Sequence, residues 1–194
     1  TYTTNNGVEP ITATLVSDTS VSGHENDYQL FSLSNGNVVV KGPNGLPAGD
    51  YYFKMNAIDS NGDPVNGVNS ATVHIVVAKT KLTVAFDDSN QTKKSVTDAA
   101  TAWNETATAT PNAGTKITYS VSGGDAYLIE IDEDSGEITY KGNGGFGKVK
   151  IKATVDDDPT TGDDNYESAF TEKEIVIYRE VDGSVTPHSN SSDT

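Results

Sequence analysis

The sequence contains no cysteine among its 194 residues. Disulfide bonds, thiol catalysis and thiolate zinc sites are therefore excluded, because each of them needs a cysteine sulfur. The absence does not by itself indicate the cytosol, since a rigid exported domain can fold without disulfides.

Basic residues are scarce. Lys and Arg together number 13 against 28 Asp and Glu, which gives a formal net charge of −15, and Arg179 is the only arginine. A surface this acidic repels phosphate, so we expect neither a nucleic-acid partner nor binding to anionic lipid. The same charge suits divalent cations, because a bound cation would reduce the self-repulsion.

Long hydrophobic runs are also missing. No apolar stretch approaches the length of a membrane span, and no signal peptide is visible at Thr1. We therefore expect no membrane insertion, and we expect the sequence to be a piece of a longer chain. Leu and Met are scarce, whereas Gly and Thr are abundant, which favours β structure.

Alternation of apolar and polar residues recurs along the chain, with turn residues at short intervals between the runs. Many short strands with such spacing are typical of β-sandwiches. The predicted strands are 11–16, 28–33, 37–41, 51–58, 70–78, 80–86, 104–110, 116–121, 127–131, 137–140, 148–155 and 171–178. A short helical turn or an irregular segment is expected over 95–103.

The pattern is repeated. Residues 31–41 match 129–141 in shape, and residues 49–63 match 147–159, each followed by an acidic loop and a last apolar strand. Two copies of one supersecondary unit predict two tandem domains, over residues 1–78 and 79–180. Residues 181–194 are expected to form a polar linker or tail. The boundary at Ala78–Lys79 has almost no linker, so we expect little bending between the domains.

The second half resembles the bacterial immunoglobulin-like repeats of large surface adhesins of the invasin, intimin or repeats-in-toxin kind. The similar segments are 114–121, 131–140, 147–154 and 162–169. The first half resembles a cadherin-type domain of bacterial adhesins, in segments 31–40, 46–62 and 71–77. The resemblance implies two tandem immunoglobulin-like or cadherin-like β-sandwiches on a bacterial cell surface, without enzymatic activity.

The chain also departs from the cadherin-type pattern. Where that family carries a Leu-Asp-Arg-Glu segment, residues 46–49 read Leu-Pro-Ala-Gly. The acidic joint between cadherin domains is replaced by 76–82, Val-Val-Ala-Lys-Thr-Lys-Leu. A complete cadherin-style calcium joint at the boundary is therefore not expected.

Asp59, Asn61 and Asp63 form the first candidate calcium loop, because their alternation resembles the way oxygen ligands gather around a hard cation. An EF-hand is excluded, since Gly62 holds the fourth position and Ser70 the twelfth. The alternative is an ordinary turn between two strands, with Asn61 and Gly62 supplying positive φ.

A second acidic loop, 156–166, stands at the equivalent place in the second copy. It is the other candidate calcium site, with Asp156, Asp157, Asp158, Asp163 and Asp164 as ligands. Without a counter-ion the three consecutive carboxylates would repel one another. The alternative is a solvated acidic loop.

Candidate ligand-binding residues are the aromatics Tyr51, Tyr52 and Trp103. In the run Tyr51-Tyr52-Phe53, at least one side chain must face away from the core. Trp103 either fills the second core or stands exposed as a ligand platform. The motif 142–147, Gly-Asn-Gly-Gly-Phe-Gly, is interpreted as a hairpin turn and not as a dinucleotide loop, because strands lie on both sides of it.

These observations predict an extracellular adhesin module, a calcium-stabilised stalk that contacts neighbouring domains of the same long chain. The alternatives are a carbohydrate- or peptide-binding tip and an accessory domain of a secreted polysaccharide-active enzyme. A cell-surface glycan or protein is the expected external partner.

Overall fold

The computed structural model describes residues 10–42, 45–65, 70–162 and 164–181. The expected ligand Asp163 and the tail 182–194 lie outside these residues. The chain divides into two compact units. The first is Thr1–Thr80 with Gly162–Tyr166, and the second is Lys81–Thr161 with Glu167–Thr194.

The prediction of an all-β chain with two tandem sandwiches is confirmed. Helical structure among the described residues consists of short 3-10 turns, which include η1 (Asp27–Leu30), η3 (Asp98–Ala100) and η4 (Ala126–Leu128). The turn η3 is what the expected helical patch over 95–103 forms. No helix in the described part of the chain is long and apolar enough to span a membrane.

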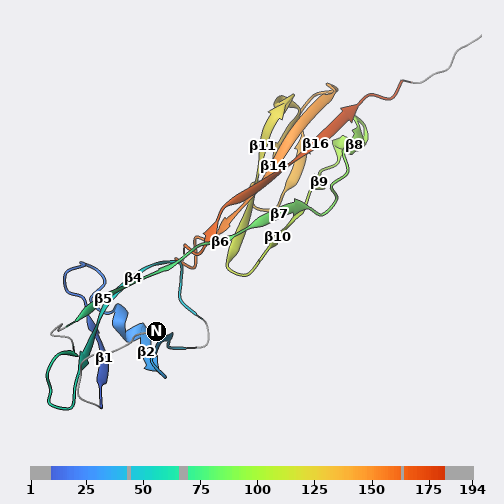
Figure 1. Cartoon of the computed structure of the whole chain (residues 1–194). Coiled ribbons are helices and arrows are strands. Elements are labelled where there is room, and N and C mark those ends of the chain that lie inside the picture. Colours follow the sequence, from blue (N-terminus) through green and yellow to red (C-terminus); the bar gives the residue numbers. More distant parts are fainter. Residues whose placement is uncertain (1–9, 43–44, 66–69, 163, 182–194) are drawn as a thin grey trace, which may run out of the picture. The chain divides into compact units, whose positions relative to one another are not determined.

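The first unit has two small β layers (Figure 1). One is an antiparallel sheet in the order β1-β4-β5, formed by β1 (Thr12–Ser17), β4 (Gly49–Ile58) and β5 (Ala71–Val77). The other is the hairpin of β2 (Phe31–Ser34) and β3 (Asn37–Val40). The rings of Phe31 and Phe53, 4.7 Å apart, join the two layers, and both side chains are buried.

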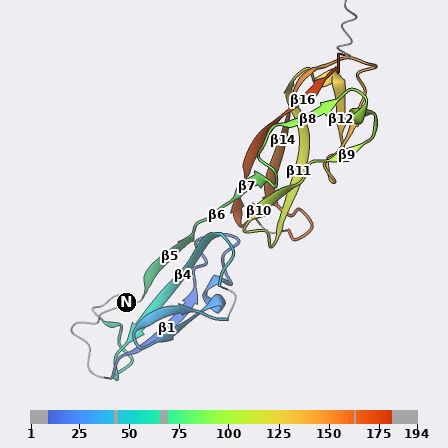
Figure 2. The same ribbon diagram turned by 90° about the vertical axis from the view of Figure 1, so that its right-hand side faces the viewer.

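The second unit has larger layers (Figure 2). Its main sheet has the order β11-β14-β16-β8, and the sheet opposite has the order β12-β13-β9. A further pair, β7 and β10, completes the strands of this unit. The residues of the short strands β6 and β15 are divided between the two units. The bounds are β6 (Thr80–Lys81), β7 (Thr83–Phe86), β8 (Thr92–Ser95), β9 (Trp103–Asn104), β10 (Ala107–Thr110), β11 (Thr115–Gly124), β12 (Ile129–Ile131), β13 (Glu137–Tyr140), β14 (Gly147–Asp157), β15 (Tyr166–Glu167) and β16 (Ala169–Tyr178).

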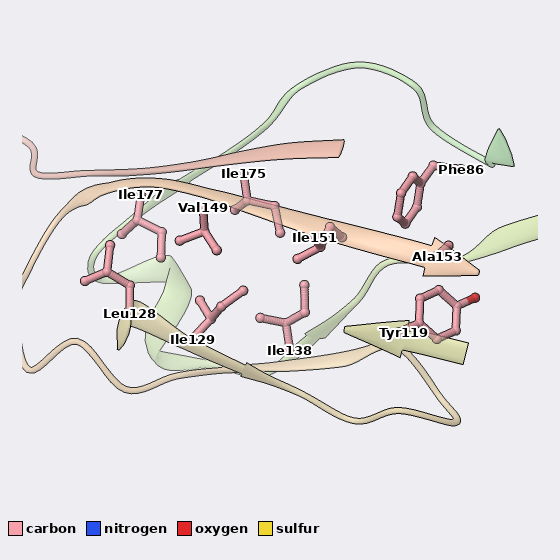
Figure 3. Packing of buried hydrophobic residues seen from close by; sticks show 10 residues of the cluster. All are labelled: Phe86, Tyr119, Leu128, Ile129, Ile138, Val149, Ile151, Ala153, Ile175 and Ile177. Atoms are coloured by element: carbon pink, nitrogen blue, oxygen red, sulfur yellow. The ribbon is translucent and has the colours of Figure 1, made fainter. Parts of the chain in front are cut away.

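The core of the second unit lies between these layers (Figure 3). Alternate residues of β14 and β16 point inward because side chains of a strand alternate between its two faces. Leu128 from η4 and Ile138 from β13 pack against them, and Phe86 comes from β7. The buried cluster is Phe86, Tyr119, Leu128, Ile129, Ile138, Val149, Ile151, Ala153, Ile175 and Ile177.

The two units repeat one topology, as the sequence predicts. The order β1-β4-β5 returns as β11-β14-β16, with all neighbours antiparallel. Gly49 lies opposite Val77, and Gly147 lies opposite Ile177, so the two copies share one register. The hairpins end alike: the Lys41 N–H donates to the Leu30 carbonyl at 2.8 Å, and the Lys141 N–H donates to that of Leu128 at 2.7 Å.

The interpretation of segment 142–147 as a hairpin turn is wrong. It joins β13 to β14, which belong to different sheets and pair with other strands. The Tyr140 hydroxyl donates to the Gly145 carbonyl at 2.6 Å and holds the connection against the core. Glycine allows the backbone to pass close to the core here, since a Cβ at Gly142 would lie 2.6 Å from Leu128 Cδ2.

Candidate functional site

The loop at Asp59 is a turn held by its own first carboxylate. Asp59 Oδ1 accepts the backbone N–H of Asn61 at 2.8 Å and that of Asp63 at 3.0 Å. Gly62 has φ +83, as expected for this turn, whereas the expectation of a positive φ at Asn61 is wrong, because Gly62 alone of these two residues adopts it. The prediction of a turn between β4 and β5 is thus confirmed, and one of the two Asp59 oxygens is already used by backbone donors.

The second acidic loop closes through Asp158. Its Oδ1 accepts the Thr160 N–H at 2.9 Å and the Thr160 hydroxyl at 2.7 Å. The Thr160 hydroxyl, the Thr160 N–H and the charge of Lys116 lower the pKa of Asp158. Asp156 Oδ1 accepts the Asp157 N–H at 2.9 Å, and Asp164 pairs with Lys79. Asp156, Asp158 and Asp164 therefore each have a hydrogen-bond donor nearby.

Neither loop gathers a formed metal site. Among the described residues, no three His, Asp or Glu side chains are grouped so that they could hold a metal ion. Asp59 and Asp158 each direct an oxygen to backbone N–H groups, and this is the arrangement of a turn. To bind a cation, the carboxylates of either loop would have to move closer to one another than they are in this structure.

Tyr51 and Tyr52 lie on opposite faces of β4, as the alternation predicts. Tyr51 faces the layer of β2, with its ring 6.0 Å from Phe31, and its hydroxyl donates to the Pro47 carbonyl at 2.8 Å. Tyr52 faces outward and is covered on both sides by imidazoles. Its ring stacks on His74 at 4.2 Å and meets His24 edge-on at 4.9 Å.

Both imidazoles of this outer face are held by carboxylates. His24 Nδ1 lies 2.7 Å from Asp27 Oδ2, which also accepts the Tyr52 N–H at 2.9 Å. His74 Nε2 lies 2.6 Å from Asp50 Oδ1. The ring of Tyr52 is therefore packed between two anchored side chains, so it offers no open platform to a ligand.

Trp103 lies at the edge of the second core, between the two placements that the sequence leaves open. It is half-buried and packs against the core cluster, and it also lines a pocket of about 420 Å³ within the second unit. Its indole Nε1–H donates to Glu105 Oε1 at 3.2 Å. The Lys94 ammonium lies 5.5 Å from the ring centroid.

A buried ion pair lies beside Trp103 in the lining of the pocket. Lys173 Nζ lies 2.6 Å from Glu105 Oε2, and these residues are 6% and 7% exposed. Glu105 Oε1 also accepts the Thr92 hydroxyl at 2.8 Å. Both oxygens of this buried carboxylate are therefore satisfied, as a buried charge requires.

Exposed polar groups complete the pocket: the carboxylates of Asp87 and Asp88 and the amide of Asn104. Hydrogen bonds from the side chains of Thr108 and Thr106 lower the pKa of Asp87, which therefore stays ionised. A volume of about 420 Å³ is within the range of small-molecule sites, ~300–1,000 Å³.

Sequence reasoning identified Trp103 but missed Glu105 and Lys173. One signal was present: Lys173 stands at an inward position of β16, two residues before Ile175, where the alternation calls for an apolar side chain. Its partner is 68 residues away in the sequence, so no local pattern connects the two.

No protein-family model matches the chain, and no curated protein matches it. Solved structures with similar architecture include mouse protocadherin-24 EC1–3, with 18% identity over 88% of this chain and 58% of that chain, TM-score 0.41. Mouse cadherin-23 EC22–24 has 18% identity over 88% of this chain and 52% of that one, TM-score 0.38. The chain thus spans little more than half of these cadherin structures.

A bacterial structure is also similar. It is a SusE-like, surface-located polysaccharide-binding protein from the heparin utilisation locus of Bacteroides thetaiotaomicron, with 15% identity over 88% of this chain and 29% of that chain, TM-score 0.32. The chain is therefore similar in structure to tandem cadherin domains and to a bacterial surface protein.

Proposed function

We propose that the chain is a non-enzymatic, extracellular module of a bacterial surface adhesin and that its two units are segments of a force-carrying stalk. The observation that supports this most directly is the repeated topology, β1-β4-β5 and β11-β14-β16, in tandem along one chain. Repetition of a small sandwich lengthens a chain without requiring a new core design for each segment.

The second unit has a strand pair suited to tension. β8, near the start of the unit, pairs in parallel with β16, its last strand, from Ile175 opposite Thr92 to Tyr178 opposite Ser95. The Val96 N–H extends the ladder by donating to the Tyr178 carbonyl at 2.8 Å. Tension between the two chain ends would shear this parallel pair, so that its hydrogen bonds share the load instead of breaking one after another.

Pulling the chain by its two ends in a single-molecule force experiment tests the stalk proposal. We expect two unfolding events, of which the stronger belongs to the second unit. Val96→Pro removes one N–H donor from the ladder and should lower the stronger force, whereas Val96→Ala keeps the donor and should change it less. A single weak event, or two that Val96→Pro leaves unchanged, would contradict the proposal.

Calcium stabilisation is the second part of the proposal, and the acidic loop 156–164 is its best-furnished place. It is supported by the net charge of −15 and by the three consecutive carboxylates of that loop, Asp156, Asp157 and Asp158. Because the carboxylates would first have to leave turn hydrogen bonds such as those of Thr160, the site should be weak and should respond to millimolar calcium.

Melting the chain with ~5 mM calcium, ~5 mM magnesium or a chelator tests this part. At ~10 times its dissociation constant a bound ion stabilises by about 1.4 kcal/mol. Calcium alone should raise the melting temperature, and Asp156→Asn with Asp158→Asn should abolish the rise. Asp59→Asn with Asp63→Asn tests the first loop in the same way. Identical melting curves under all three conditions would remove calcium from the proposal.

The alternative of a carbohydrate- or peptide-binding tip is favoured by one observation, the pocket at Trp103. The alternative of an accessory domain in a polysaccharide-active enzyme predicts a catalytic domain in the full-length protein, so the complete gene sequence decides it.

A further inference from the structure

We propose that the pocket at Trp103 binds a neutral sugar residue of a glycan. This goes beyond the stalk function, which depends on strand pairing and would stand without it. The argument rests on the buried ion pair, on the way Trp103 is held and on the charges around its ring.

The internal repeat has an apolar residue where the second unit has the lysine of the ion pair. Lys173 lies opposite Ile151 in the sheet, and the same register position in the first unit is Val73, opposite Phe53. A buried ion pair is often no more stable than apolar residues of similar size. The first copy has such an apolar residue, so the charged pair in the second copy points to a role in the pocket that it lines.

That role is to fix the indole ring. Glu105 accepts the Trp103 Nε1–H and is itself held by Lys173 and Thr92. The ring can therefore rotate little, and a pre-organised ring loses little conformational entropy when a ligand stacks on it. A buried Trp that served only as packing would need its N–H satisfied, but one neutral acceptor would be sufficient.

The charges around the ring exclude two ligand classes. The Lys94 ammonium lies 5.5 Å from the ring centroid and repels the cation of a basic peptide. Asp87 and Asp88 line the same pocket and repel uronic acids, sulfates and phosphates. The ligand class that these charges leave open is a neutral molecule rich in hydroxyl groups.

A sugar residue matches the remaining chemistry. One aromatic ring can contact the apolar face of a pyranose, while carboxylates, an amide and an ammonium group bind its hydroxyls. Asp87 and Asp88 accept, Lys94 donates, and Asn104 does both. Most ligand pockets are lined chiefly by apolar side chains, whereas this one combines a single aromatic with polar groups.

Trp103 is the only tryptophan in the chain, so its fluorescence reports on this pocket directly. The full chain is titrated with neutral hexasaccharides of glucose, mannose, galactose and xylose to about 10 mM, a limit that detects even millimolar affinity. Matched titrations use a uronic-acid hexasaccharide and a lysine-rich hexapeptide. We expect a saturable change with at least one neutral sugar and none with the charged probes.

Variants separate the pocket from the rest of the unit. Asn104→Ala and Asp88→Ala should each weaken binding about tenfold, the effect of one hydrogen bond to a sugar hydroxyl. Phe146→Ala is the matched control, because Phe146 is an exposed aromatic of the second unit with Arg179 over its ring, and it does not line the pocket. It should bind as the unaltered chain does.

The double variant Glu105→Leu with Lys173→Val keeps Trp103 but releases its N–H. It should remain folded and lose most of the sugar affinity.

The proposal is overturned by the absence of a saturable change with every neutral sugar. It is also overturned by preferred binding of the peptide or the acidic sugar, or by Phe146→Ala weakening binding as much as Asn104→Ala.

Discussion

The two units share a topology but differ in how fully they enclose their cores. Among the described residues, buried apolar side chains number three in the first unit and fourteen in the second, so the second should be the more stable. The inner face of the β5 strand shows the difference: Val73, Ile75 and Val77 are half-exposed, whereas Lys173, Ile175 and Ile177 of β16 are buried.

The core of the second unit is more deeply buried because this unit has additional strands. β7, β8, β9 and β10 precede β11: β8 extends the main sheet, β9 joins the sheet opposite, and β7 pairs with β10 and places Phe86 in the buried cluster. In the first unit, none of the described residues form counterparts of these strands. The repeated pattern therefore sets the strand order, and the additional strands set the depth of burial.

The largest expected effect comes from breaking the ion pair that distinguishes Lys173 from Val73. Glu105→Ala leaves Lys173 charged, buried and without its partner, and should lower the unfolding free energy of the second unit by about 3–5 kcal/mol. The double variant Glu105→Leu with Lys173→Val makes the site resemble the first unit and should restore most of this loss. Denaturant unfolding followed by Trp103 fluorescence measures both.

If the double variant is as unstable as Glu105→Ala, the ion pair is required for folding, and the comparison with Val73 is misleading. Lys93→Ala is a suitable control, because Lys93 is the exposed residue of β8 and has no partner among the ion pairs described above.

A sharper version of the comparison uses two isoleucines at the same register position. Ile175→Ala opens a cavity in a closed core and should cost about 3–4 kcal/mol, whereas Ile75→Ala removes a half-exposed side chain and should cost about 1–2 kcal/mol. Trp103 fluorescence follows the second unit. The proton resonances of His24 and His74 follow the first.

Equal losses for the two substitutions would mean that the inner face of the first unit is covered as completely as that of the second. Val76→Ala is the control for both, since Val76 is 65% exposed and should matter little.

The sequence was sufficient to predict the elements that depend on local pattern. Strand alternation identified β4 and β14, the paired hairpins identified the repeat, and the Asp59 turn followed from its Asn-Gly-Asp chemistry. These features involve residues close together in the chain, where backbone geometry follows directly from residue type.

The features that sequence reasoning missed depend on contacts between distant segments. Segment 142–147 was interpreted as a hairpin because nothing local shows that β13 and β14 belong to different sheets. Glu105 and Lys173 were missed because only the closed sandwich brings them together. The acidic loops suggested calcium, but the spacing of carboxylates along the chain does not determine where their oxygens point.

The hairpin glycines provide the next test. Gly36 and Gly136 have φ angles of +74° and +71°, a backbone conformation that favours glycine at both positions. A Cβ at Gly136 would lie 2.5 Å from the Glu105 carbonyl oxygen, whereas one at Gly36 would meet nothing within 4 Å. Gly36→Ala should cost about 1 kcal/mol from backbone strain alone, and Gly136→Ala about 2–4 kcal/mol.

Thermal unfolding measures the two glycine variants. Asn substitutions distinguish strain from crowding, because Asn tolerates a positive φ better than Ala does. Gly36→Asn should recover part of the stability lost in Gly36→Ala, while Gly136→Asn should not. Recovery at both positions would show that the turn of the second unit is no more crowded than that of the first.

The smallest expected effect concerns a lysine that the two copies use differently. In the first unit Lys54 pairs with the buried Asp18 at 3.0 Å, whereas its counterpart Lys152 lies over the ring of Phe170. A hydrogen bond from the Ser20 hydroxyl, the pairing with Lys54 and the Ser20 N–H lower the pKa of Asp18.

A carboxyl group with a lowered pKa in the folded state stabilises that state above its unfolded pKa, about 3.9 for Asp, and this contribution is lost as the pH falls through the folded value. Asp18→Asn should therefore destabilise the first unit at pH 7, and the difference from the unaltered chain should shrink below about pH 4. Phe170→Ala should alter the second unit by an amount that does not depend on pH, because the contact that it removes joins an ammonium group to a phenyl ring and involves no carboxyl group. Melting curves between about pH 2 and 7, read from the His24 and His74 resonances and from Trp103, measure both. A constant effect of Asp18→Asn across this range would show that Asp18 acts through its hydrogen bonds to Ser20, without a contribution from its charge.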